Sequence, residues 1–125
     1  MVNVNYRRGY KLEYNSKKLL ENAGWIVTRL PASKSPADLI AIKNGKTLLI
    51  QCKKTQKDSL YVYGLNTLRE KAKKHGAIPV LVYGFGRSPA YAKRITGDKE
   101  KLKKSEKNTL LREFISLIAK NYQKR

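Results

Sequence analysis

The stretch SKSPADLIAIKNGKTLLIQCK, residues 33–53, contains two short apolar runs separated by a tight-turn dipeptide. The runs cover residues 39–42 and 47–50, and Asn44-Gly45 between them is the strongest short-range signal for a β-hairpin. We therefore predict two antiparallel strands joined at this dipeptide. Their pairing determines which polar side chains meet at the open end of the hairpin.

Three of those polar residues carry the chemistry. Asp38 precedes the first run, while Gln51 and Lys53 follow the second, so the pairing brings them close together. Alternation along a strand places Gln51 and Lys53 on one face and Cys52 on the other. An acid, an amide oxygen and a lysine suit Mg²⁺-assisted phosphodiester hydrolysis. A strand end with solvated polar residues is the alternative interpretation of this stretch alone.

Length and composition indicate one globular domain, with 125 residues and 41% hydrophobic residues. No apolar run approaches the ~20 residues that span a bilayer, and the N-terminus lacks a signal-peptide apolar segment, so we expect no membrane partner. The single cysteine, Cys52, cannot form an internal disulfide, which fits a reducing, cytoplasmic setting. One Cys and one His exclude a metal site built on these residue types.

The charge balance indicates a polyanionic partner. Lys and Arg number 28 against nine Asp and Glu, for a formal net charge of +19. Nucleic acid is the first candidate, because no segment sets basic residues opposite an apolar face as a membrane-surface helix would. Such binding weakens steeply as salt rises, since each phosphate contact releases counterions.

Hydrophobic periodicity predicts an α/β domain with a mixed five-stranded sheet flanked by helices. Besides the hairpin, the expected elements are a helix over 10–23, a strand over 25–30, an extended or turn-like segment at 61–63, a helix ending just before Gly76, strands over 78–83 and 91–95, a charged linker over 96–105 and a helix over 109–122. We assign residues 1–95 to the core with a basic N-terminal arm. Residues 96–125 are assigned to the linker and a helix that packs on the same domain or at a dimer interface.

Two groups near the N-terminus have alternative interpretations. Arg7 and Arg8 are either a solvated terminus or a phosphate clamp, which we favour because Arg binds phosphate in a bidentate manner. Glu13 also has two interpretations. The helix dipole favours an acid near the start of a helix, or the Glu13 carboxylate reaches a metal from this position.

Several short motifs occur in a fixed order along residues 7–95. They are Arg8-Gly9-x-x-x-Glu13, Gly24-Trp25-x-Val27-x-Arg29, Ser33, Asp38-Leu-Ile-Ala-Ile, Gly45, Ile50-Gln51-Cys52-Lys53, Leu60-Tyr61-Val62 and the segment from Gly76 to Val82. In this order and spacing the chain resembles the archaeal-type Holliday junction resolvases, a branch of the PD-(D/E)xK nuclease superfamily. The C-terminal segment has no counterpart in this resemblance.

The resemblance implies a restriction-endonuclease-like nuclease core that acts as a homodimer. It implies paired symmetric nicks across four-way junction DNA with Mg²⁺, for which Mn²⁺ substitutes, and no small-molecule cofactor. Metal-binding positions would be Glu13, Asp38, Gln51 and the backbone carbonyl of Cys52, with Lys53 as the catalytic lysine and Ser33 near the scissile phosphate. DNA-binding positions would be Arg7, Arg8, Arg29, Lys34, Lys54 and Lys57.

The chain departs from the family pattern at Gln51, where the family has an acid two residues before the lysine. An amide oxygen still ligates Mg²⁺ but brings no charge, so metal binding should be weaker. Two alternatives to a junction resolvase follow: a non-catalytic DNA-binding protein on the same fold, and a related nuclease acting on other branched or duplex DNA.

Overall fold

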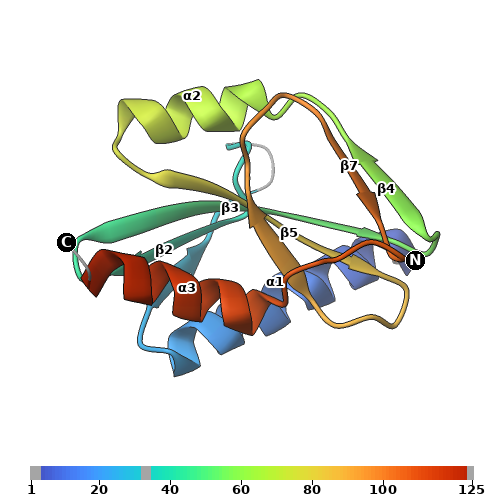
Figure 1. Ribbon diagram of the computed structural model, residues 1–125, viewed down its shortest axis with the longest axis horizontal. Helices are drawn as coiled ribbons and strands as arrows, with labels where there is room; N and C mark the ends of the chain where they lie inside the picture. The colour runs from blue at the N-terminus through green and yellow to red at the C-terminus, as the bar shows by residue number, and fades with distance from the viewer. Residues whose placement is uncertain (1–3, 32–34, 124–125) are drawn as a thin grey trace.

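The computed structural model describes residues 4–31 and 35–123, with side chains between Tyr10 and Lys120. Its elements follow one another along the chain as Figure 1 shows. They are α1 (Val4–Asn22), β1 (Ile26–Arg29), β2 (Leu39–Lys43), β3 (Lys46–Thr55), β4 (Ser59–Val62), α2 (Asn66–Lys74), β5 (Ile78–Phe85), β6 (Tyr91–Arg94), β7 (Glu100–Lys103) and α3 (Leu111–Gln123).

Five strands form one mixed sheet in the order β1-β2-β3-β5-β6. β3 and β5 are parallel, and the other neighbouring pairs are antiparallel. Asn44 and Gly45 connect β2 to β3 with φ values of 50° and 77°. Positive φ at both positions is what a two-residue type I′ turn requires. The predicted hairpin and the mixed five-stranded sheet are confirmed.

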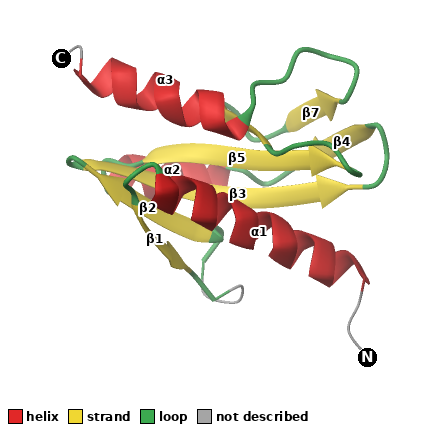
Figure 2. Ribbon diagram, turned by 90° about the horizontal axis from the view of Figure 1, so that it is seen from below, coloured by secondary structure: helices red, strands yellow, loops and turns green. Residues whose placement is uncertain are grey.

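Helices cover both faces of this sheet. α1 and α3 lie on one face and α2 on the other (Figures 1 and 2). β5 contributes to both cores, because Val80 and Val82 pack in the cluster with α1 and α3 while Leu81 and Tyr83 pack in the cluster with α2. A strand covered on both faces needs an apolar residue at nearly every position, which accounts for the unbroken apolar run.

Three expectations about element boundaries were wrong. α1 begins at Val4 rather than at Tyr10, so most of the expected N-terminal arm is helical. β3 continues to Thr55, two residues beyond Lys53, where a polar connection was expected to begin. Residues 96–105 are not simply a linker, since β7 forms within them and pairs with β4, a strand where only an extended segment was expected.

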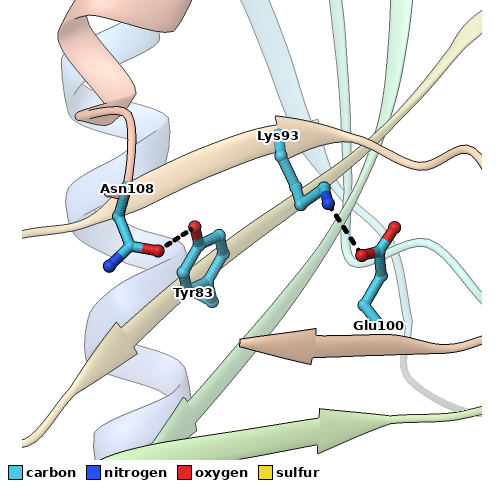
Figure 3. A network of polar contacts seen from close by, with 4 residues as sticks. All are labelled: Tyr83, Lys93, Glu100 and Asn108. Atoms are coloured by element: carbon cyan, nitrogen blue, oxygen red, sulfur yellow. Dashed lines mark hydrogen bonds and ion pairs between the residues drawn. The ribbon is translucent and has the colours of Figure 1, made fainter. Parts of the chain in front are cut away.

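A polar network explains how the charged segment folds back onto the domain (Figure 3). Glu100 is only 8% exposed, and its carboxylate accepts a hydrogen bond from Lys93 Nζ on β6 at 2.7 Å. Beyond β7, the Tyr83 hydroxyl donates to Asn108 Oδ1 at 2.8 Å. The inward positions of such a strand are usually apolar. Because Glu100 occupies one of them and is paired with Lys93, β7 lacks the apolar–polar alternation by which a strand is recognised in a sequence.

α3 closes the sheet face that α1 covers only in part. Leu111, Ile115 and Ile118 are buried in the same cluster as Leu12 and Leu20 of α1. Among the described residues, no helix combines the length and apolar character needed to cross a bilayer.

The substitution Ile115→Ala tests the packing of α3. Ile115 is 5% exposed, so its truncation leaves a cavity. We expect the free energy of unfolding to fall by about 2–5 kcal/mol, measured by urea denaturation. Leu117→Ala is the matched control, because Leu117 on the same helix is 52% exposed. If both variants lose the same small amount, α3 does not pack on its own sheet.

Candidate active site

The site forms where β3 loses one of its two neighbours. β2 pairs with β3 only as far as Leu39 opposite Ile50, whereas β5 continues alongside β3 to Thr55. Residues 51–55 of β3 are therefore paired along one edge alone. The backbone groups along the other edge are available to side chains or ligands.

Asp38 occupies the first part of this open edge. Its backbone N–H donates to the Ile50 carbonyl at 2.7 Å, and its carboxylate Oδ2 accepts a hydrogen bond from the Cys52 N–H at 2.7 Å. The Asp38 carboxylate thus accepts the hydrogen bond that a backbone carbonyl would accept if β2 and β3 stayed paired beyond Leu39 and Ile50. Because the N–H and C=O of one strand residue point to the same edge, the Cys52 carbonyl faces this edge too.

Alternation along β3 sends its side chains to opposite faces. Leu49 belongs to the α2-side core, and Gln51 and Lys53 follow it on that face. Cys52 packs against the opposite core, beneath α1. Gln51 is half-buried and Lys53 is exposed. Lys53 lies close enough to Asp38 for its positive charge to lower the pKa of that carboxyl.

α1 brings Glu13 to the same place. The neighbouring Leu12 is buried in the core, which orients this turn of the helix. Glu13 Oε1 lies 3.5 Å from Nε of Arg29, at the end of β1, and the Glu13 side chain is 18% exposed. The Arg29 guanidinium also lies over the Tyr10 ring, at 4.6 Å from its centroid. Arg29 is thus held between a carboxylate and an aromatic ring.

The two carboxylates oppose each other's ionisation. Burial raises the pKa of Glu13, and the Asp38 charge raises it further, while Arg29 lowers it by charge and hydrogen bonding. Burial also raises the pKa of Asp38, against the Cys52 N–H and the charges of Lys53 and Arg29, which lower it. A divalent cation between the two carboxylates would relieve both the desolvation and the repulsion.

The donors at this site are oxygens, the ligands that Mg²⁺ prefers. The candidate donors are the carboxylates of Glu13 and Asp38 and the carbonyl of Cys52, with the amide of Gln51 as the fourth predicted one. Within residues 4–31 and 35–123, no three His, Cys, Asp or Glu side chains gather as a metal site. The donor set therefore suits a hard cation that keeps several waters, and it has only two charged ligands.

The Cys52 thiol takes no part in this chemistry. Burial raises its pKa well above the usual value, and the Asp38 and Glu13 charges raise it further. The thiol stays protonated and is therefore a poor nucleophile and metal ligand. Cys52 can act at the site through its backbone alone.

The structure brings together Glu13, Asp38 and Lys53, and the strand pairing places Gln51 next to them. Arg29, predicted as a phosphate contact, forms an ion pair with Glu13, and its side chain is 41% exposed. Lys54 is half-buried in β3, and Lys57 is exposed in the turn after it. Ser33 and Lys34 lie outside the described residues, as do the side chains of Arg7 and Arg8.

Sequence reasoning missed Tyr10 and the pairing of Arg29 with Glu13. The two partners come from α1 and β1, so their contact depends on how the helix crosses the sheet. One feature of the sequence could have indicated this contact: Glu13 lies near the apolar stripe of a helix, in a chain rich in Lys and Arg. A half-buried acid in such a chain is expected to have a basic neighbour.

Comparison with known proteins gives a consistent result. The family model for the archaeal Holliday junction resolvase (Hjc) matches residues 4–120. The crossover junction endodeoxyribonuclease Hjc of Methanocaldococcus jannaschii is 40% identical over 57 residues, which are 46% of this chain and 42% of that protein. The match thus spans less than half of the relative's length. The resemblance inferred from the motifs is confirmed.

A solved structure shares the fold. It is that of Archaeoglobus fulgidus Hjc, described as a Holliday junction resolvase from an archaeal hyperthermophile. The TM-score is 0.67 at 19% sequence identity, and the superposition covers 82% of this chain and 98% of that one. The predicted fold class, a restriction-endonuclease-like α/β core, is confirmed.

Asp38→Asn tests the electrostatic strain at the site. Because its pKa is raised by folding, Asp38 binds its proton more tightly in the folded state, so the stability of the metal-free protein falls as pH rises through the folded pKa. An Asn oxygen still accepts from the Cys52 N–H without charge. We expect Asp38→Asn to raise the Tm by a few degrees at neutral pH in chelator, and the difference from wild type to vanish at about pH 3.

Asp58→Asn serves as the control, because Asp58 is exposed in the turn between β3 and β4. Its Tm should follow wild type at every pH. A lower Tm for Asp38→Asn at neutral pH would mean that the charged hydrogen bond to Cys52 outweighs the repulsion and the desolvation.

Proposed function

The chain belongs to the archaeal Holliday junction resolvase family, and from this premise we propose that it is a metal-dependent endonuclease that cuts four-way DNA junctions by paired, symmetric nicks. The observation that carries the proposal is the pair of mutually repelling carboxylates, Glu13 and Asp38, at the open edge of β3. Lys53 follows on the same strand, beside Asp38.

Mg²⁺, or Mn²⁺ in its place, suits this donor set. Glu13, Asp38, Gln51 and the Cys52 carbonyl would hold it, and when bound it would lower the pKa of a water and neutralise charge on the phosphate. The hydrogen bond from the Cys52 N–H orients the Asp38 carboxylate before any ligand arrives. Arg29 restrains Glu13 in the same way.

Lys53 supplies the positive charge that acts on the scissile phosphate. Its ammonium group is exposed and close to Asp38, so it can contact a scissile phosphate at the site. There it stabilises the negative charge that develops as the bond to the leaving oxygen breaks, or orients the attacking water. Gln51 beside it donates or accepts hydrogen bonds but provides no charge.

The substrate follows from charge and symmetry. With 28 Lys and Arg residues the protein binds phosphate backbones, and backbone and shape contacts suffice to select a branched structure. A two-fold homodimer would present two sites to a junction whose strands are themselves related by an approximate two-fold axis. No step in this scheme needs a small-molecule cofactor.

The decisive measurement uses an immobile, labelled four-way junction and a linear duplex of the same sequence, each with Mg²⁺ or Mn²⁺. We expect symmetric nicks on the junction alone, abolished by chelator. Lys53→Ala should reduce cleavage by about 10²–10³-fold, because one transition-state contact is lost, with junction affinity nearly unchanged. Lys57→Ala, which removes an exposed cation outside the acid pair, should lower affinity and cleavage together.

Two results would contradict the proposal. Tight junction binding without nicks in either metal would identify a non-catalytic binding protein, a candidate that the uncharged Gln51 favours. Equal cleavage of duplex and junction would identify a nuclease of the same superfamily with a different substrate. If Lys53→Ala lowers affinity in proportion to cleavage, Lys53 acts in binding rather than in catalysis.

Gln51→Glu tests the proposed weak ligand separately. A third carboxylate should strengthen metal binding, so half-maximal cleavage should occur at a lower metal concentration, with the maximal rate retained or raised. Titration of Mg²⁺ in the junction assay measures both quantities. Loss of cleavage in this variant would show that Gln51 is not simply a weak metal ligand.

A further inference from the structure

Two exposed tyrosines on β4 and directly after it form a stacked pair. Tyr61 is 52% exposed and Tyr63 is 61% exposed. Their ring centroids lie 5.5 Å apart with an interplanar angle of 10°. Scattered exposed aromatic residues need no explanation, but two parallel rings held together at the surface are an organised feature.

The pairing of β4 with β7 explains why these rings face outward. Leu60 and Val62 pack in the α2-side core, so the alternate residues Tyr61 and Tyr63 point away from it. β4 and β7 form a separate two-stranded ribbon rather than joining the main sheet (Figures 1 and 2). The outer face of this ribbon has no covering element among the described residues.

Lys101 completes the feature. It lies opposite Tyr61 in the β4–β7 register, and its Nζ is 5.5 Å from the centroid of the Tyr61 ring. The preceding residue, Glu100, points inward to Lys93, as Figure 3 shows, which turns Lys101 outward. We call Tyr61, Tyr63 and Lys101 the tyrosine platform.

Positive charge surrounds the tyrosine platform. The exposed lysines of β7 and its flanks are Lys99, Lys101, Lys103, Lys104 and Lys107. Three of them, Lys101, Lys103 and Lys107, line a pocket beside the ribbon. A ligand that fits this surface has flat aromatic groups for the rings and closely spaced negative charges for the lysines.

We propose that the tyrosine platform binds unpaired nucleotides of single-stranded DNA. Bases would stack on the tyrosine rings, and phosphates would contact the neighbouring lysines. Double-stranded DNA fits less well, because its base faces are already stacked on one another. From the proposed function this inference takes only that the partner is DNA, and it needs neither metal nor cleavage.

Binding of a fluorescent oligo(dT) of about 15 nucleotides, followed by anisotropy in chelator, tests the proposal. Tyr63→Ala should weaken this binding about five- to hundred-fold, the range for loss of one stacked base. Tyr63 lies beyond the last paired residue of β4, so this variant leaves the ribbon ladder intact. Tyr63→Phe and Tyr61→Phe keep the rings and should bind within about twofold of wild type, because every base presents a π-face.

Tyr14→Ala is the matched control. Tyr14 on α1 is 46% exposed and has Lys18 Nζ at 5.6 Å from its ring centroid, so it has the same exposed aromatic–lysine pairing without a stacked partner ring. It should bind oligo(dT) as wild type does. A duplex of equal length should lose less than about twofold in affinity with Tyr63→Ala, since its base faces are covered.

Three outcomes would overturn the proposal. They are an equal loss of duplex and single-strand affinity with Tyr63→Ala, an equal loss with Tyr14→Ala, and tighter binding of an oligo(rU) of the same length than of oligo(dT). Because the readout is binding without metal, an absence of junction cleavage leaves this result unaffected. Retained oligo(dT) binding in Lys53→Ala would separate the two sites directly.

Discussion

The parallel pairing of β3 with β5 is the constraint on which the rest of the structure depends. It runs from Leu48 opposite Ile78 to Thr55 opposite Phe85 and separates the two cores of the domain. Since β5 supports β3 over this whole length, β2 can leave after Ile50 without unravelling the strand. The same arrangement therefore stabilises the fold and leaves one edge of β3 open. The carboxylate of Asp38 and the amide of Cys52 meet at this edge.

The hydrogen bonds and ion pairs at the site do not fully offset the cost of burying the charged carboxylates of Glu13 and Asp38. Arg29 and Lys53 lower the pKa of Asp38, yet burial still raises it. A fully compensated site would have little affinity for a cation, because nothing would be gained when the cation bound. A site whose carboxylates are only partly neutralised lowers the stability of the fold somewhat, but it still attracts a cation. Functional sites often combine these two properties.

Local patterns predicted much of this structure, and tertiary contacts account for what they missed. The hairpin and the convergence of Asp38 with Gln51 and Lys53 were predictable, because a two-residue turn determines its own register. The contact of Arg29 with Glu13 was not, since it depends on how α1 lies across β1. Nor was β7, where Glu100 stands at an inward position and is satisfied by a lysine from another strand.

The contact between α1 and α3 has a consequence for biosynthesis. Leu111, Ile115 and Ile118 complete the core around α1, the helix that carries Glu13, and they are among the last of the described residues to be translated. On the ribosome the part of this core that α3 completes therefore stays exposed until these residues have emerged. A nascent chain at that stage exposes apolar surface and is prone to aggregate. Chains that stop before α3 would therefore carry Glu13, Asp38 and Lys53 on a domain whose core is incomplete.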